Sequence, residues 1–270
     1  MPVVLSTVDV IKYTKGLTMR IAVVDYKNPV MKKAMEMCPE YDFVACDTVE
    51  EACEKINVGE ADALIAGIDI TTREMVLACK ARLKKTSTYF SSCFLMEKDD
   101  QKIIVADAGI CKNPSAEMMK DIIIETHKTA KRLLRSTPRV ALLSYSSFGS
   151  GGNDPTTSRI LEAMRLAKEE NPEMIIDGEM QLDVAICPQV AAKKAGNSEV
   201  AGRANVLICP DLNAGNILYK SMERFGGFTA AGPILQGFDA VASDLSRGST
   251  AEDVVLTFRV LEKLHKKPSC

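Results

Sequence analysis

Histidine is scarce in this chain of 270 residues, which contains only His127 and His265. His127 lies inside a long helix-like segment and His265 in a lysine-rich tail. Neither lies among cysteines or carboxylates at a spacing typical of metal ligands, so we expect no metal site. No Ser-His-Asp or Cys-His arrangement can be argued from these two residues. The common hydrolase mechanisms that depend on histidine are therefore not indicated.

Long hydrophobic runs and basic stripes are also missing. The longest apolar runs, such as residues 122–124 and 206–209, are far too short to span a bilayer. The first 17 residues show no charged segment followed by a long apolar stretch, so we expect no signal peptide. The net charge is −2, and the basic residues are scattered. We therefore expect neither a membrane nor a nucleic acid as a partner.

Cysteine, in contrast, is abundant, with nine residues, but none forms a C-x-x-C pair. An odd, scattered set in a chain of this size is typical of reduced, mostly buried thiols in a cytoplasmic protein. The chain is 46% hydrophobic, which is enough for one large core or two modest ones. We expect a globular protein whose cysteines serve mainly in packing.

Strand-like and helix-like segments alternate through the first 67 residues. Compact apolar runs at 20–26, 42–47 and 61–67 predict strands, and helical spacing predicts helices over 29–38 and 48–56. This alternation indicates an α/β fold with a largely parallel sheet.

The pattern changes from about residue 86. One strand candidate ends at the polar residues 97–102, and a second begins there. The pair predicts a hairpin that brings antiparallel strands into the sheet. A long helix over 116–134, a strand at 140–146 and a helix over 158–170 follow. The apolar run at 204–210 predicts a strand buried on both faces, and a last helix begins near Thr250.

The segment SYSSFGSGGND, residues 144–154, joins a predicted strand to a predicted helix. Its glycines let the backbone approach a ligand, and its serines and the following helix N-terminus offer donors to an anion. It is not a Walker A loop, because the pattern GxxxxGK[ST] is absent. It is not a GxGxxG motif either, because Asp154 occupies the third glycine position. Asp154-Pro155 is also a good helix start. A phosphate-binding loop and a plain strand–helix turn both remain open.

Three carboxylates lie close together at Asp177, Glu179 and Asp183. Glu179, Gln181 and Asp183 alternate with apolar residues, so an extended segment would place them on one face. The pattern favours a solvated polar face over an acidic site.

Polar side chains also follow the buried strand at 204–210. Asp211, Asn213 and Asn216 come where ligands bind in open α/β sheets, although capping of the next helix explains them equally well. Asn216 lies too far into the helix to be a simple cap, which makes it the most suggestive of the three.

The segment SDLSRGSTAEDVV, residues 243–255, carries the clearest chemistry. Ser246 and Arg247 offer a hydroxyl and a guanidinium in one turn, and arginine binds phosphate through paired hydrogen bonds. Thr250 and Asp253 have the spacing of a capping box, so a structural role is a real alternative for Asp253.

Together these segments resemble the phosphate acetyltransferase (phosphotransacetylase) family. The resemblance runs from about residue 86 to 265, and it includes VALLSYSSFGSGG, DGEMQLDVAICP, PDLNAGNILYK, AAGPILQG and SDLSRGSTAEDVV. It implies a two-domain, three-layer αβα fold like that of isocitrate dehydrogenase, with a mixed sheet and the active site in the interdomain cleft. Residues 1–84 and 236–270 would form a first, shortened domain, and residues 85–235 the second.

The implied activity is that of an acyltransferase. Acetyl, or a close short-chain acyl group, would pass reversibly between coenzyme A and inorganic phosphate, with acyl phosphate as the other substrate. Coenzyme A is then a substrate, and no separate cofactor is needed. The family commonly forms homodimers. A catalytically impaired or regulatory homologue that binds CoA or acyl phosphate, and a propanoyl- or butyryl-specific member, are the alternatives. A metal- and NAD-dependent decarboxylating dehydrogenase of the same fold lacks support, because no acidic cluster matches its metal site.

The resemblance also implies roles for particular residues. Ser246 and Arg247 would be catalytic, the first donating to the developing oxyanion and the second holding phosphate or acyl oxygen, and Asp253 would be the general base. Substrate-binding candidates are Ser144, Ser147, Gly149, Ser150 and Asn216.

The chain departs from the family pattern in its first domain. An arginine of the family's substrate-binding set falls on Leu77. Arg73 lies one helical turn earlier, and we expect it to compensate, because an aliphatic side chain cannot replace arginine at a phosphate site.

Overall fold

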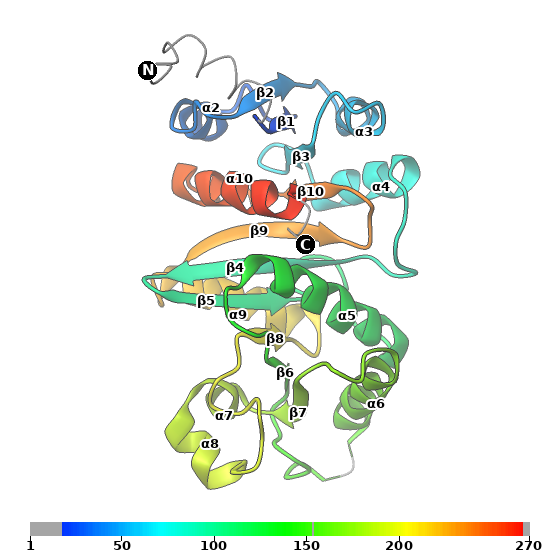
Figure 1. Cartoon of the computed structure of the whole chain (residues 1–270), viewed down its shortest axis with the longest axis vertical. Helices are drawn as coiled ribbons and strands as arrows, with labels where there is room; N and C mark the ends of the chain where they lie inside the picture. The colour runs from blue at the N-terminus through cyan, green and yellow to red at the C-terminus, as the bar shows by residue number, and fades with distance from the viewer. Residues whose placement is uncertain (1–17, 153, 267–270) are drawn as a thin grey trace, which may run out of the picture.

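The structure, a computed structural model, describes residues 18–152 and 154–266. Strands and helices alternate along the chain, which confirms the α/β class (Figure 1). The elements of the first part are β1 (Arg20–Val23), α2 (Pro29–Glu36), β2 (Asp42–Ala45), α3 (Val49–Asn57), β3 (Ala63–Ala66) and α4 (Thr72–Arg82). Each predicted strand and helix of this part is present, within a few residues of its expected bounds.

The second part begins with the predicted hairpin. Its elements are β4 (Ser91–Lys98), β5 (Gln101–Ala106), α5 (Ala116–Leu133), β6 (Val140–Leu143), α6 (Pro155–Glu170), β7 (Ile176–Met180), α7 (Leu182–Ile186), α8 (Pro188–Lys194), β8 (Val206–Ile208), α9 (Leu212–Arg224) and β9 (Thr229–Gln236). The chain then returns to the first part through β10 (Val241–Asp244) and α10 (Ala251–His265).

The ten strands form one sheet in the order β2-β1-β3-β10-β9-β4-β5-β8-β6-β7. The first four of these strands are parallel, and so are the last four. Between them β9 runs antiparallel to both β10 and β4, and β4 runs antiparallel to β5. The mixed sheet expected from the sequence is thus confirmed. The expected domain division follows the return of β10 and α10, yet the sheet itself is continuous, and the division stays a prediction.

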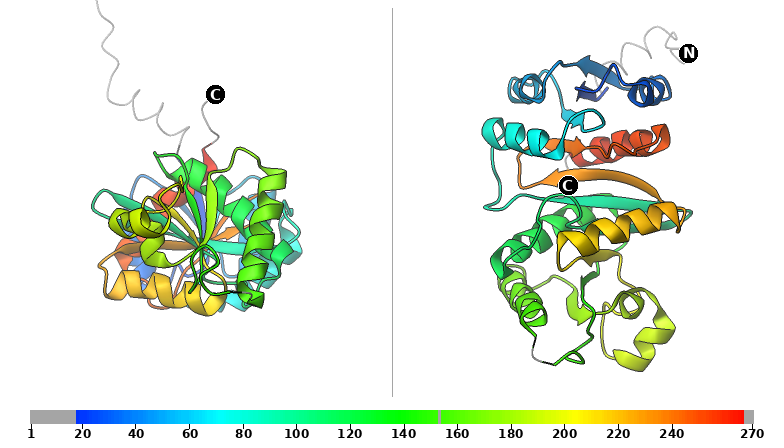
Figure 2. Two further views of the ribbon diagram at one scale, coloured as in Figure 1. Left: turned by 90° about the horizontal axis from the view of Figure 1, so that it is seen from below. Right: turned by 180° about the vertical axis from the view of Figure 1, so that it is seen from behind.

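Helices cover both faces of the sheet. On one face α2, α10, α5 and α6 pack in series over a large apolar core that reaches from Met31 in α2 to Ile160 in α6. On the other face α3 and α4 cover the first part, and α7, α8 and α9 cover the second. Two further views show these layers and the fanning of the twisted strands (Figure 2). The resulting αβα sandwich has one core shared by both parts, a second that lies mainly in the first part and reaches Leu235 of β9, and a third confined to the second part.

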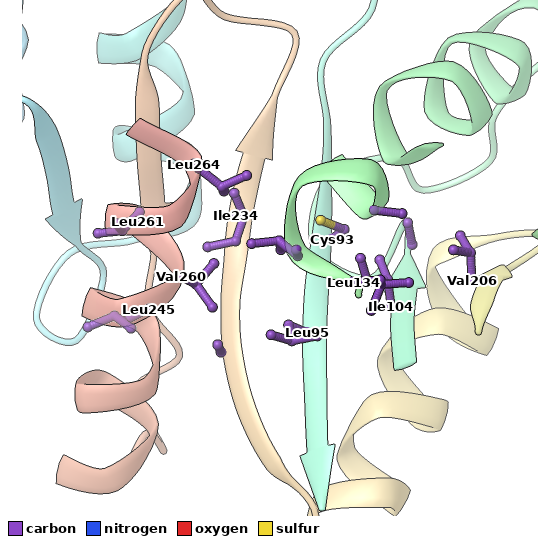
Figure 3. Packing of buried hydrophobic residues seen from close by; sticks show 14 of the residues in the cluster. Cys93, Leu95, Ile104, Leu134, Val206, Ile234, Leu245, Val260, Leu261 and Leu264 are labelled. Atoms are coloured by element: carbon purple, nitrogen blue, oxygen red, sulfur yellow. The ribbon is translucent and has the colours of Figure 1, made fainter. Parts of the chain in front are cut away.

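The shared core crosses the middle of the sheet. Val260 and Leu264 of α10 lie next to Ile234 of β9, Leu261 points away from it on the same helix, and Leu95 lies on the neighbouring β4 (Figure 3). All five side chains are buried. Burial of one such side chain stabilises the fold by roughly 1.5–3 kcal/mol, so this packing joins the two parts firmly on this face.

Two expectations about residues 176–188 are wrong. The extended segment ends at Met180, because residues 182–186 form α7 and Asp183 lies in its first turn. Glu179 is 1% exposed and is therefore not on a solvated polar face. Alternation over a few residues could not distinguish a strand from a strand followed by a short helix.

The eight cysteines in the described residues are free thiols, and seven of them are buried, as expected. In the described part of the chain no helix is both long and apolar enough to cross a membrane.

Candidate active site

A pocket of about 270 Å³ lies where the two parts of the chain meet, on the sheet face covered by α4 and α9. Its walls come from the loops after β3 and β10, from the start of α4, from α9, and from β4, β9 and the turn after β5. The lining residues are Gly67, Ile70, Thr71, Thr72, Phe94, Ala108, Gly109, Asn216, Tyr219, Lys220, Pro233, Asp244, Leu245, Ser246 and Arg247. Three residues predicted for the site, Asn216, Ser246 and Arg247, are thus brought together.

The first wall depends on a close approach of two loops. The Leu245 amide donates to the Ala66 carbonyl at 2.5 Å, which ties the end of β10 to the end of β3. Gly67 has φ +114, and a Cβ at this position would lie 2.5 Å from the Leu245 nitrogen and 2.6 Å from an Asp244 carboxyl oxygen. Only glycine fits here, because its neighbours leave no room and its backbone is in the left-handed region.

The Ser246–Arg247 turn extends from this junction into the pocket. The Gly248 amide donates to Ser246 Oγ at 3.3 Å, and the Ser249 amide donates to the Ser246 carbonyl at 2.9 Å. These bonds fix the turn while the Ser246 hydroxyl hydrogen stays available to a ligand. Arg247 is exposed at the pocket wall, and its guanidinium can bind an oxyanion.

The opposite wall is one face of α9. Asp211 caps this helix by accepting from the Ala214 amide at 2.9 Å, whereas Asn216 lies inside the helix and lines the pocket, as expected. Lys220 follows one turn later on the same face and adds a second cation. Gly215 lets the helix approach the turn after β5, because a Cβ there would lie 2.1 Å from the Asp107 carbonyl oxygen.

The pocket floor is aromatic. Phe94 of β4 and Tyr219 of α9 stack with ring centroids 3.9 Å apart, and both are buried. Beside this floor, Thr71 caps α4 with a capping box, accepting from the Glu74 amide, and Thr72 begins the helix. The pocket therefore combines an apolar base with hydroxyl, amide and cationic groups on its walls, as small-molecule sites commonly do.

Asp253 lies outside the lining of this pocket. It completes the capping box of α10: Oδ2 accepts from the Thr250 amide and from Thr250 Oγ1, both at 2.8 Å. Oδ1 accepts from the Ala230 amide at 3.2 Å, and the residue is 5% exposed. The capping interpretation is confirmed, and the role of Asp253 as a base stays a prediction.

The loop at 144–152 also lies outside the pocket lining. Its polar groups bond mainly within the protein: Ser146 Oγ and the Gly149 amide both donate to Glu179 Oε1, at 2.8 and 2.9 Å. Ser147 Oγ accepts from the Gln181 amide, Ser150 Oγ accepts from the Ser147 amide, and Ser144 Oγ accepts from the Ser146 amide. Substrate contacts from Ser144, Ser147, Gly149 and Ser150 therefore stay predictions.

The expected compensation by Arg73 likewise stays a prediction. Arg73 is exposed on the first turn of α4, next to Thr72, but it does not line the pocket. Leu77 is 54% exposed and lines a different hollow of about 570 Å³ together with Glu50 and Glu74. These carboxylates make that hollow a poor anion site.

Two buried carboxyls lie behind the first wall. Asp25 is 4% exposed and accepts from the amides of Ile68 and Asp69; burial raises its pKa, and these hydrogen bonds offset part of the rise. Asp244 lines the pocket and is 1% exposed. Burial raises the pKa of Asp244 to about 6, with a smaller contribution from the negative charge of Asp25.

The sequence analysis missed Asp244, Lys220, Thr71 and Thr72 as pocket residues. Lys220 had a usable signal, because it follows Asn216 at helical spacing. The position of Asp244 depends on the loop after β3, which no pattern in its own segment reveals. Within the described residues, no group of three or more histidine, cysteine or carboxylate side chains is arranged to hold a metal ion.

Comparison with known proteins agrees with this architecture. The family model described as Phosphate acetyl/butaryl transferase matches residues 3–260. A phosphate acetyltransferase of Acetivibrio thermocellus is 42% identical over 208 residues, and one of Bacillus subtilis is 43% identical over 202. These matches cover 74% and 73% of this chain but only 62% and 61% of the relatives, so the chain spans about three fifths of their length.

A solved structure shows the same fold over nearly the whole chain. The crystal structure of a phosphotransacetylase from Streptococcus pyogenes has a TM-score of 0.80 and 27% identity, covering 97% of this chain and 99% of that one. The sequence motifs, the fold and the extent of the family match agree, and the chain belongs to the phosphate acetyl/butyryl transferase family.

Proposed function

We propose that this protein transfers an acetyl group, or a close short-chain acyl group, reversibly between coenzyme A and inorganic phosphate. The observation that carries the proposal is the meeting of Ser246, Arg247, Asn216 and Lys220 around one pocket with an aromatic floor. A volume of about 270 Å³ suits an acyl phosphate better than a whole coenzyme A molecule, most of which would lie outside. Relatives named phosphate acetyltransferase support the acetyl group.

In the proposed mechanism the CoA thiolate attacks the carbonyl carbon of acetyl phosphate. A carbon–sulfur bond forms, and the bond from that carbon to the phosphate oxygen breaks with its electron pair. Ser246 donates a hydrogen bond to the carbonyl oxygen as negative charge develops there, and such a donor is worth roughly 3 kcal/mol in the transition state. Arg247 and Lys220 bind the phosphate oxygens, which favours both the bound substrate and the leaving group.

Coenzyme A enters this reaction as a substrate, and the mechanism gives no step to a separate cofactor. We further propose a homodimer that works in the cytoplasm, where the buried free thiols remain reduced. Size-exclusion chromatography with light scattering tests the homodimer.

The test of function is an acyl-CoA-forming assay. Acetyl, propanoyl and butyryl phosphate are each mixed with CoA and purified protein, and thioester formation is followed by ultraviolet absorbance. We expect turnover, fastest with acetyl phosphate, and a fall in kcat of about 10²–10³-fold in Ser246→Ala. Faster turnover with propanoyl or butyryl phosphate would assign the longer acyl group instead. No turnover with any of them from folded protein would favour a homologue that only binds CoA or acyl phosphate.

A further inference from the structure

The length of the acyl chain does not follow from family membership, because the family includes both acetyl and butyryl transferases. An acyl phosphate offers a pocket three parts to recognise: the phosphate, the carbonyl oxygen and the hydrocarbon chain. In the proposed function Arg247 and Lys220 bind the phosphate, and Ser246 donates to the carbonyl oxygen. The hydrocarbon chain then needs an apolar surface, and the largest apolar side chains of the pocket lining are the stacked rings of Phe94 and Tyr219.

The phosphate-binding cation and the aromatic floor are close together. Lys220 Nζ lies 4.9 Å from the centroid of the Tyr219 ring, and both residues line the pocket. In acetyl phosphate only the carbonyl carbon and one oxygen separate the methyl group from phosphorus. A phosphate bound at Lys220 therefore brings the methyl group within reach of the floor.

The two rings of this floor are fixed by their packing. Their centroids are 3.9 Å apart with 16° between the planes, and Phe94 and Tyr219 are 2% and 5% exposed. The backbone of β9 bounds the Phe94 ring, because a Cβ at Gly232 would lie 3.3 Å from Phe94 Cδ1. Since packed side chains have no vacant rotamer to adopt, a longer acyl chain cannot gain room by turning either ring aside.

We propose that the Phe94–Tyr219 stack sets the length of the acyl chain: the methyl of an acetyl group rests on the rings, and each added methylene meets them. The inference rests on the proposed acyl transfer and deepens it, because it names acetyl phosphate and acetyl-CoA as the preferred substrates. One methylene in a hydrophobic pocket changes kcat/KM by about 10–200-fold. Phe94 and Tyr219 are thus specificity-determining residues, and they take no part in the bond-making steps.

The experiment measures kcat/KM for acetyl, propanoyl and butyryl phosphate with CoA in wild type, Phe94→Leu and Tyr219→Leu. In wild type kcat/KM should fall by about 10–200-fold with the first added methylene. Each substitution replaces one ring by a smaller apolar side chain, so the ratio of kcat/KM for butyryl phosphate to that for acetyl phosphate should rise at least about 10-fold. This ratio is taken within one preparation, so a smaller folded fraction in a variant cancels.

The matched control is Phe90→Leu. Phe90 stacks on Phe238 with ring centroids 4.4 Å apart, and both rings are buried, but neither lines the pocket. Phe90→Leu therefore removes a stacked ring of the same kind from the same sheet and should keep the wild-type ratio. A ratio that rises equally in this control would overturn the proposal, because general loosening of the core would then explain the effect.

The remaining outcomes separate this inference from the proposed function. Wild-type protein that turns over none of the three acyl phosphates contradicts the acyltransferase function, and the length limit with it. Active wild type whose kcat/KM does not fall with chain length overturns the length limit alone. An unchanged ratio in folded Phe94→Leu and Tyr219→Leu also overturns it. If circular dichroism shows that one of these two variants is unfolded, the other decides, because each removes one ring of the same stack.

Discussion

Replacing Asp244 by asparagine should change how the stability of the protein depends on pH. The carboxyl has its pKa raised from 3.8 to about 6 in the folded state, chiefly by burial. The folded protein therefore holds this proton more tightly than the unfolded chain, and stability is lost as the pH rises from about 4 to about 6. A shift of about two units corresponds to roughly 3 kcal/mol when the carboxyl is fully ionised. The residue is 1% exposed, so solvent screens little of this cost.

About half of that cost is already present at pH 5, because the unfolded carboxyl is ionised there, and nearly all of it is present at pH 8. The stability of Asp244→Asn relative to wild type should therefore increase by about 1.5 kcal/mol between these two pH values. In a chain of this size the matching change in the Tm difference is roughly 3–6 °C.

Urea unfolding followed by circular dichroism at several pH values from about 5 to about 8 measures this difference. Asp121→Asn is the matched control. Burial alone would raise the pKa of Asp121, but hydrogen bonds from Lys120 and Ser87 outweigh burial and lower it. The stabilisation by Asp121 is therefore already complete at pH 5, and its loss in the variant should be nearly constant over the range. A constant difference for Asp244→Asn as well would refute the reasoning and mean that its carboxyl is partnered.

Three other substitutions test the site more locally. Gly67→Ala should destabilise the fold by more than about 3 kcal/mol, since a Cβ there meets the backbone of Leu245 at 2.5 Å with φ +114; thermal unfolding measures this, and a wild-type Tm would contradict the close approach. Asp253→Asn should cost about 1–2 kcal/mol through the weakened cap of α10, whatever its effect on turnover, and an unchanged unfolding midpoint would show that the cap contributes nothing. Arg73→Ala should raise the KM for acetyl phosphate several-fold if this side chain compensates for Leu77, because a lost guanidinium weakens phosphate binding; an unchanged KM removes Arg73 from the site.

Much of the fold could be predicted from the sequence because each element carries its own signal. Apolar runs such as residues 63–66 are flanked by polar turns, and helices such as α10 show their caps and their buried stripe. The hairpin of β4 and β5 could be anticipated from the polar turn alone. The segment after Met180 could not, because a five-residue helix leaves too few positions to establish a period.

The residues of the candidate site could also be predicted only in part. The Ser246–Arg247 turn and Asn216 stood out because their residue types do not fit a purely structural role, and the pocket contains all three. The loop at 144–152 has equally suggestive residues, yet Glu179 engages its serine and glycine donors from a neighbouring strand. Whether a hydrogen-bond donor is free or occupied depends on contacts between distant segments, such as that of Ser146 with Glu179. Such contacts cannot be predicted from the residue types of one segment.

The junction between the two parts of the chain has unequal faces. On one face α10 and α5 seal it with the shared apolar core, while the other face holds the pocket. Between β9 and β10 the ladder has a single register pair, Ser243 with Ile234, supported by a bond from Ser243 Oγ to the Pro233 carbonyl. Any bending of the sheet at this seam would therefore change the width of the pocket, whereas the shared apolar core on the opposite face would resist separation of the two parts. An anion bound by both Arg247 and Lys220 would link the loop after β10 to α9 across the pocket and would oppose such bending.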